Sequence, residues 1–279
     1  MAPRIQESSE HKSRRRALDK LEKSVSNLSL QQYHPRELKR FSIEILPLPL
    51  SPDGFPAVKP LFFQPFEKPL DDPNFKDPDL RSEYPTYALS EEWKQGLEAE
   101  PGYGITPMDW ARDTAHFFGS YLQHLLSREG KDTPGYENLY VASIGKWGCE
   151  LYDIRPGFAW QAAGLSQESG AAHRKCFMVC DVNGDDEHIA RAELLCITRI
   201  MDRFFRAYSF VDFLTVLLLS FLGPRHGRIF QAHFDGGKLV IRKSKLFDFG
   251  NKNIAAMKIF IRWWCSTAVG DTTSAKIAS

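Results

Sequence analysis

Proline is distributed very unevenly along this chain, and that distribution limits where regular structure can form. Thirteen of the seventeen prolines fall at or before Pro101, and between Leu46 and Pro85 one occurs every few residues. Proline removes a backbone hydrogen-bond donor and biases the preceding residue toward extended geometry. The sequence therefore predicts a proline-rich extended arm over residues 41–102, poor in both helix and sheet.

The N-terminal region also changes the sign of its charge. Residues 1–40 carry ten Lys or Arg residues and five acids, whereas residues 41–106 carry five and twelve. We expect residues 1–40 to form a basic disordered tail. Its basic cluster consists of Lys12, Arg14, Arg15, Arg16 and Lys20. This cluster can act as a nuclear localisation signal or as an arm on a nucleic-acid backbone, or it can simply be a solvated part of the tail.

A globular pattern begins near Tyr103, and we expect the folded domain to span residues 103–268, followed by a disordered tail over 269–279. Apolar residues recur at spacings of three and four in three stretches, which predicts helices at 106–129, 190–208 and 251–264. Stretches with the composition of strands are 139–144, 149–154, 175–182, 213–222, 228–234 and 238–247. The order of these elements indicates an α+β fold, with an antiparallel sheet packed by two or three helices.

Composition bounds the compartment and the class of partner. The chain has 36 Lys or Arg residues against 35 acids, a formal net charge of +1, which excludes a uniformly cationic nucleic-acid binder. Five cysteines, an odd number, in a chain that opens with polar residues favour a reducing intracellular compartment, cytoplasmic or nuclear. The longest apolar run, Phe213 to Gly223, is shorter than the roughly 20 residues of a membrane-spanning helix, so we expect no membrane insertion.

A short cationic loop is the leading candidate for a binding site. Gly223 and Pro224 introduce Arg225, His226 and, after Gly227, Arg228, between two apolar strands. Cationic and titratable side chains in a tight loop can gather around a phosphate or carboxylate. The alternative is that glycine and proline make the connection while the basic side chains are solvated.

Two residues of the following strand and turn extend this candidate site. His233 lies in the next predicted strand, and Asp235 opens the Asp235-Gly236-Gly237 turn that signals a hairpin. Either side chain could move a proton, so His226, His233 and Asp235 are the candidate catalytic residues.

The last seventy residues are rich in cations. They include Arg242, Lys243 and Lys245, which the predicted hairpin brings toward Arg225 and Arg228. Such a basic face can bind nucleic acid or an acidic partner. A solvated edge strand protected by lysine explains the same residues equally well.

A metal site is not expected. The nearest group of ligands is His173, Cys176 and Cys180, but on a strand the two cysteine Cα atoms would lie about 13 Å apart, too far to share one zinc. We therefore expect both cysteines to be small buried residues of the sheet.

The common enzyme signatures are missing, and no cofactor is expected. The chain has no phosphate-binding loop, no dinucleotide-type glycine triplet, no nucleophile elbow and no helix with paired zinc histidines. Glu92, Trp93 and Lys94 match the acid-any-lysine spelling of restriction-type nucleases, but they fall in the proline-rich arm and we discount the match.

The C-terminal half resembles a family of uncharacterised proteins of filamentous fungi. The residues that carry the resemblance are Phe221, Gly223, Pro224, Arg225, His226, Gly227, Gln231, His233, Asp235, Gly236, Ser244, Lys245, Leu246, Phe247 and Asp248. Some members are encoded beside secondary-metabolite biosynthetic genes, so the resemblance implies an accessory role in such a pathway. It implies no catalytic residue.

Three hypotheses for function follow. The first is a non-catalytic intracellular accessory or interaction protein with a protein partner. The second is an unfamiliar enzyme acting on an anionic small molecule, held by Arg225, His226 and Arg228. The third is a nucleic-acid-binding protein that uses the basic C-terminal face.

Overall fold

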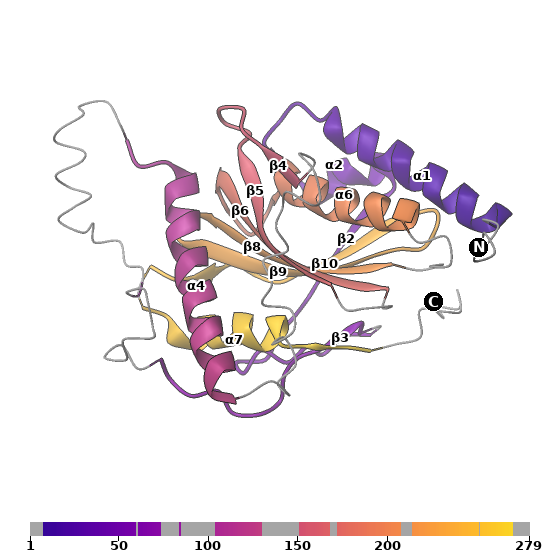
Figure 1. Ribbon diagram of the computed structural model, residues 1–279. Helices are drawn as coiled ribbons and strands as arrows, with labels where there is room; N and C mark the ends of the chain where they lie inside the picture. Colours follow the sequence, from indigo (N-terminus) through magenta and orange to yellow (C-terminus); the bar gives the residue numbers. More distant parts are fainter. Residues whose placement is uncertain are drawn as a thin grey trace, which may run out of the picture.

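A mixed sheet with helices on both faces carries the fold (Figure 1). The structure is a computed structural model that describes residues 8–59, 61–73, 84, 104–129, 151–167, 172–207, 214–250 and 252–269. Its helices are α1 (Ser9–Ser26), α2 (Pro35–Leu38), the 3₁₀ helix η1 (Lys39–Phe41), α4 (Pro107–Glu129), α6 (Arg191–Ala207) and α7 (Ile254–Trp264). None of the helices formed by these residues has the length and apolar character needed to cross a membrane.

The eight-stranded main sheet has the order β2-β10-β9-β8-β6-β5-β4, with β11 paired to β9. In chain order its strands are β2 (Ile43–Pro47), β4 (Tyr152–Asp153), β5 (Trp160–Gln167), β6 (His173–Asn183), β8 (Thr215–Gly223), β9 (His226–Phe234), β10 (Leu239–Lys243) and β11 (Phe247–Asp248). The pairs β6–β8 and β2–β10 are parallel, and the other pairs are antiparallel. The expected α+β class is confirmed, with a sheet that is mixed instead of purely antiparallel.

Two small ribbons complete the strand inventory of the described residues. One pairs β1 (Gln32–Tyr33) with β7 (Ile189–Ala190), and the other pairs β3 (Phe63–Gln64) with β12 (Thr267–Ala268). Each ribbon ties a segment of the first seventy residues to one much later in the chain.

The central sheet separates two apolar clusters. On one face, α1 and α6 pack against side chains such as Met178, Leu218 and Phe230. On the other face, α4 and α7 cover side chains such as Leu219 and Ile229. Figure 1 shows α1 and α6 above the sheet and α7 below it, while α4 runs from the level of the sheet down to α7. Strand residues therefore alternate between the two clusters, as a sheet buried on both faces requires.

Most expected elements of the folded domain correspond to those observed, but the expected strand 238–247 divides into β10 and β11. Helices were expected at 106–129, 190–208 and 251–264, and the structure forms α4, α6 and α7 there. The predicted hairpin is also formed, because β9 and β10 pair antiparallel with Phe234 opposite Leu239. β5 (Trp160–Gln167) lies in a stretch for which the sequence predicted no element. The expected strand 139–144 and Glu92-Trp93-Lys94 lie outside the described residues, as does the expected tail 269–279 except for Val269.

The expected disordered tail is corrected by the structure from residue 8 onward, and residues 1–7 lie outside the described residues. Residues 9–26 form α1, whose buried side chains include Leu18, Leu21 and Val25 and join the cluster between α1 and α6. Ser8 caps this helix by accepting a hydrogen bond from the backbone N–H of His11 at 3.0 Å. Packing of an apolar stripe, and not composition alone, decides whether a basic segment folds.

The expected extended arm over residues 41–102 is corrected in the same way where it is described. Its first part is extended, but it is a strand of the main sheet: Ile43 to Pro47 pair in parallel with Leu239 to Lys243. A later part forms β3 and pairs with β12. The extended backbone of these segments is hydrogen-bonded to other strands. Together with the packing of α1, this makes residues 9–47 part of the same packed unit as the sheet.

Candidate functional site

The β8–β9 turn holds Arg225 inside the molecule. The turn contains a cis peptide bond between Gly223 and Pro224, and Arg225 has a left-handed backbone with φ of 62°. Its guanidinium lies 2.5 Å from a carboxylate oxygen of Asp113 and stacks over the ring of Trp110 at 4.4 Å from the centroid. Arg225 is only 4% exposed, so α4 supplies an anion and an aromatic surface to its cation, while Nε and Nη1 make no hydrogen bond among the described residues.

Arg228 is held even more completely. Its side chain and that of Glu193 are 2% and 0% exposed, and two guanidinium nitrogens donate to the two carboxylate oxygens at 2.8 and 2.5 Å. A third nitrogen donates to the carbonyl oxygens of Asp185 and His188 at 2.9 and 2.7 Å. The bidentate pair joins β9 to the first turn of α6.

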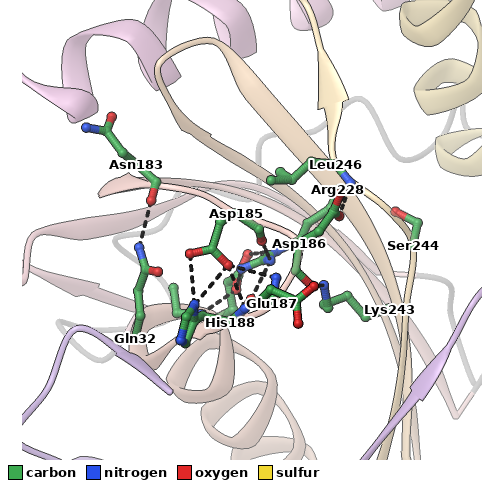
Figure 2. A network of polar contacts seen from close by, with 12 residues as sticks. Gln32, Asn183, Asp185, Asp186, Glu187, His188, Arg228, Lys243, Ser244 and Leu246 are labelled. Carbon is green, nitrogen blue, oxygen red and sulfur yellow. Dashed lines mark hydrogen bonds and ion pairs between the residues drawn. The ribbon is translucent and has the colours of Figure 1, made fainter. Parts of the chain in front are cut away.

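The loop 183–188, which Arg228 contacts, is itself a network of polar contacts (Figure 2). A carboxylate oxygen of Asp186 accepts from the backbone N–H of Leu246 at 2.8 Å, and the carbonyl oxygen of Asp186 accepts from the Lys243 ammonium at 2.7 Å. Gln32 donates to the carbonyl of Asn183 at 2.7 Å. These contacts connect the loop to β1, β9, β10 and the segment after β10. They therefore stabilise the fold.

Asp185 and His188 form the partly exposed end of this network. The His188 ring nitrogen Nδ1 lies 2.9 Å from one Asp185 carboxylate oxygen, and that carboxylate also accepts from the backbone N–H of His188. These contacts hold the pKa of Asp185 below its ordinary value, against a burial effect that raises it. The pair is therefore a charged carboxylate with an oriented imidazole at the surface.

The spacing of Asp181, Asn183 and Asp185 is a signal that could have directed attention to this loop. Alternating oxygen side chains followed by an acid on a helix are typical of calcium loops. Here Asp181 instead accepts from the backbone N–H of Met108 at 3.1 Å, and Glu193 binds the Arg228 guanidinium. In the part of the chain that the structure describes, no three ligating side chains are arranged to hold a metal ion.

His226 is the third residue of the predicted cationic loop. It begins β9, where it pairs with Leu222 of β8 and Asp248 of β11, and it is half-buried. Its ring nitrogen Nδ1 is buried and has no hydrogen-bond partner among the described residues. The three residues of the predicted loop thus lie near one end of the sheet but do not form one site, because Arg225 contacts α4 on one face and Arg228 contacts α6 on the other.

His233 and Asp235 do not join these three residues. His233 stands an odd number of positions after Arg228 on the same strand, so it faces the α7 side, where its ring lies 5.1 Å from that of Phe62. Asp235 accepts from the backbone N–H groups of Gly237 and Lys238 at 2.8 and 2.6 Å, which stabilises the hairpin turn. The sheet therefore separates Arg228 from His233, and Asp235 is used in the turn at the other end of β9.

Burial of His233 predicts a pH dependence of stability. Desolvation lowers its pKa from 6.5 to about 4, although Asp235 partly opposes the shift. Below pH 6.5 the unfolded chain binds a proton that the folded chain does not, so stability falls by up to about 1.4 kcal/mol per pH unit until pH 4. Urea unfolding at several pH values, compared with His233→Gln, should show a smaller slope in the variant. Equal slopes would contradict the shift.

A second group of polar side chains, which sequence reasoning missed, lies on the α7 face near His233. Neighbouring strands carry His173, Lys175 and Gln231 there, all nearly inaccessible. The Lys175 ammonium donates to the carbonyl of Ser266, and the His173 ring lies 3.1 Å from the carbonyl of Val269.

The β3–β12 ribbon covers this polar group. The backbone N–H of Phe62 donates to Gln231 at 2.9 Å, and the ring of Phe63 contacts His173 at a centroid distance of 5.4 Å. Backbone carbonyls of the ribbon region thus accept from the buried Lys175 ammonium and lie at hydrogen-bond distance from the His173 ring, which explains how polar residues can face the core here.

The predicted basic C-terminal face is not assembled as expected. Arg225 and Arg228 are buried against carboxylates, as described above. Arg242 donates to the carbonyl of Lys59 at 2.7 Å, Lys243 donates to that of Asp186, and burial lowers the pKa of Lys243. Of the five residues expected there, only Lys245 is classed as exposed.

The cysteines behave as expected from their strand positions. Cys176 and Cys180 are completely buried in the cluster beneath α6. The Cys176 sulfur lies 3.7 Å from that of Cys196, and burial raises the pKa of Cys180 and Cys196 well above the ordinary thiol value. Thiols held in the protonated form are poor nucleophiles.

Comparison with known proteins adds no assignment to these observations. No protein-family model, curated protein or solved structure matches the chain.

Proposed function

We propose that this protein acts by binding another macromolecule and does not itself catalyse a reaction. The alternative, an enzyme for an anionic small molecule, needs Arg225 and Arg228 to be available to a substrate. Each of these cations is instead neutralised by a carboxylate of the chain itself. A substrate would have to displace Asp113 or Glu193 before it could bind.

The Arg228 guanidinium is the observation that carries this proposal. It makes four hydrogen bonds, two to Glu193 and one each to the carbonyls of Asp185 and His188, out of the five N–H donors that an arginine has. Removing one partner of such a buried pair is costly, because it leaves an uncompensated charge. A side chain committed in this way maintains the fold.

We further propose that the protein is intracellular and has an accessory role in a fungal biosynthetic pathway. The four described cysteines are free thiols, the state that a reducing compartment maintains. The pathway rests on the resemblance of the C-terminal half to fungal proteins, some of which are encoded beside secondary-metabolite biosynthetic genes.

Thermal unfolding with small anions tests the non-catalytic proposal. We expect phosphorylated and carboxylated metabolites to leave the melting temperature of the wild-type protein unchanged. Binding would be detected, because a ligand that binds only the folded state adds about 2.7 kcal/mol to the free energy of unfolding at 100 times its Kd. The panel should be repeated with Arg225→Ala/His226→Ala and with the exposed-lysine control Lys59→Ala/Lys245→Ala.

A saturable rise in melting temperature that the control variant retains and the Arg225→Ala/His226→Ala variant loses would overturn the proposal. It would identify the β8–β9 turn as a site for an anionic ligand and favour the enzyme hypothesis. Turnover of the same compound by the wild-type protein would establish that hypothesis.

A further inference from the structure

The outer side of α1 carries a row of cations that the fold leaves exposed. The helix buries His11, Arg14, Leu18, Leu21 and Val25 at spacings of three and four, which fixes one side against the cluster with α6. Its exposed cations are Lys12, Arg16, Lys20 and Lys23, which we call the basic ridge. At 100° per residue the two sets point in opposite directions, and the ridge extends about 16 Å along the helix axis.

The three acids of α1 leave most of this ridge unpaired, because they pair with other cations. Asp19 binds Arg206 of α6 at 2.6 Å, and Glu22 binds Arg199 of α6 at 3.2 Å. Glu10 pairs with the buried Arg14 at 2.7 Å. Within the ridge only Lys23 has an acid partner, Asp19 at 2.9 Å.

The remaining three cations of the ridge are exposed at the surface. Among the described residues, no carboxylate lies within ion-pair distance of Lys12, Arg16 or Lys20. Lys39 and Arg40 of η1, which adjoins α1, are also exposed. Three like charges on successive turns repel one another, so a linear polyanion laid along them is favoured.

The chemistry of the ridge favours a nucleic acid over the other polyanionic surfaces. Protein interfaces have an apolar core and are depleted in lysine, whereas the ridge consists of three lysines and one arginine. A helix that lies on a membrane inserts its apolar side, but the apolar side of α1 is already buried against α6. The phosphates of a nucleic-acid backbone, in contrast, can be bound by cations at regular intervals without an apolar contact.

We propose that the basic ridge of α1 binds the phosphate backbone of a nucleic acid without reading its sequence. This inference rests on the proposed function, since it names the class of macromolecule that the protein binds. It differs from the expected disordered basic arm, because the cations are held on a rigid helix in a fixed row. Binding should therefore depend on three particular side chains more than on net charge.

Fluorescence anisotropy with a labelled DNA duplex of about 30 base pairs tests the proposal, using the full chain at several salt concentrations. We expect the logarithm of the binding constant to fall linearly with the logarithm of salt concentration. Each lost phosphate contact reduces that slope by about 0.9, so Lys12→Gln/Arg16→Gln/Lys20→Gln should reduce it by about 2.7. The variant should lose affinity equally for duplexes of different sequence.

Lys59→Gln/Lys68→Gln/Lys245→Gln is the matched control, because it removes the same charge from exposed lysines elsewhere. It should keep the wild-type slope, and circular dichroism should show that both triple variants fold. Equal losses in the two variants, or no binding by the wild-type protein, would overturn the proposal. Equal or tighter binding to a poly-glutamate peptide would also overturn it and assign the ridge to an acidic protein. These outcomes leave the small-anion test of catalysis unaffected, so the two proposals fail separately.

Discussion

Replacing Glu193 by alanine is expected to lower the free energy of unfolding by about 3–5 kcal/mol. The substitution leaves the guanidinium of Arg228 charged at a position where its side chain is 2% exposed. It also removes the oxygen that accepts from the backbone N–H of Ala190 at 2.8 Å, just before α6 begins. Equilibrium unfolding in urea, with the slope of the transition compared between proteins, measures the loss.

Two further variants show whether the loss comes from the buried charge. Glu193→Met/Arg228→Met removes both ions and should be more stable than Glu193→Ala, because no charge is left uncompensated. Asp202→Ala breaks the partly exposed pair with Arg206 and should cost about 1 kcal/mol or less. If Glu193→Ala costs no more than Asp202→Ala, the pair is not buried as described.

Leu18→Ala is expected to destabilise the protein by about 2–5 kcal/mol. Leu18 is completely buried in the cluster that α1 forms with α6, so truncation leaves a cavity between the two helices. Urea unfolding measures the cost, and limited proteolysis should detect earlier cleavage within residues 9–26 of the variant.

Leu30→Ala provides the control for this prediction. Leu30 follows the same helix but is 56% exposed, so its truncation should change stability by about 0.5 kcal/mol or less. Equal stability of Leu18→Ala and the wild-type protein, together with cleavage of both within residues 9–26, would contradict the docking of α1. The segment would then behave as the disordered tail that its composition suggested.

The elements that sequence analysis predicted correctly are those whose pattern is strong and local. The helices α4, α6 and α7 have apolar residues at helical spacing, and the β9–β10 hairpin has a turn that determines its own geometry. α1 was missed because two of the five buried positions in its stripe are His11 and Arg14. A count of charges does not reveal this stripe, because the segment becomes a buried helix only through its packing against α6.

The candidate site shows the same limit for contacts between distant residues. The sequence predicted that Arg225, His226 and Arg228 gather in one loop, but in the structure Arg225 and Arg228 contact helices on opposite faces of the sheet. The sequence could not show that Arg228 would meet Glu193, 35 residues earlier, or that Arg225 would meet Asp113 of α4. The separation of His233 from Arg228 was available in principle, because strand residues an odd number apart face opposite sides of a sheet.

The position of β2 has a consequence for any shortened form of the protein. β2 covers the side of β10 that faces away from β9, through the pairs from Ile43–Leu239 to Pro47–Lys243. A chain beginning at residue 103 would leave that row of backbone donors and acceptors open, together with the surface of α6 that α1 shields. Open strand edges recruit strands from other molecules. In the full chain β2 takes the edge position instead and ends in Pro47, which cannot donate a backbone hydrogen bond, so we expect the shortened form to self-associate more readily.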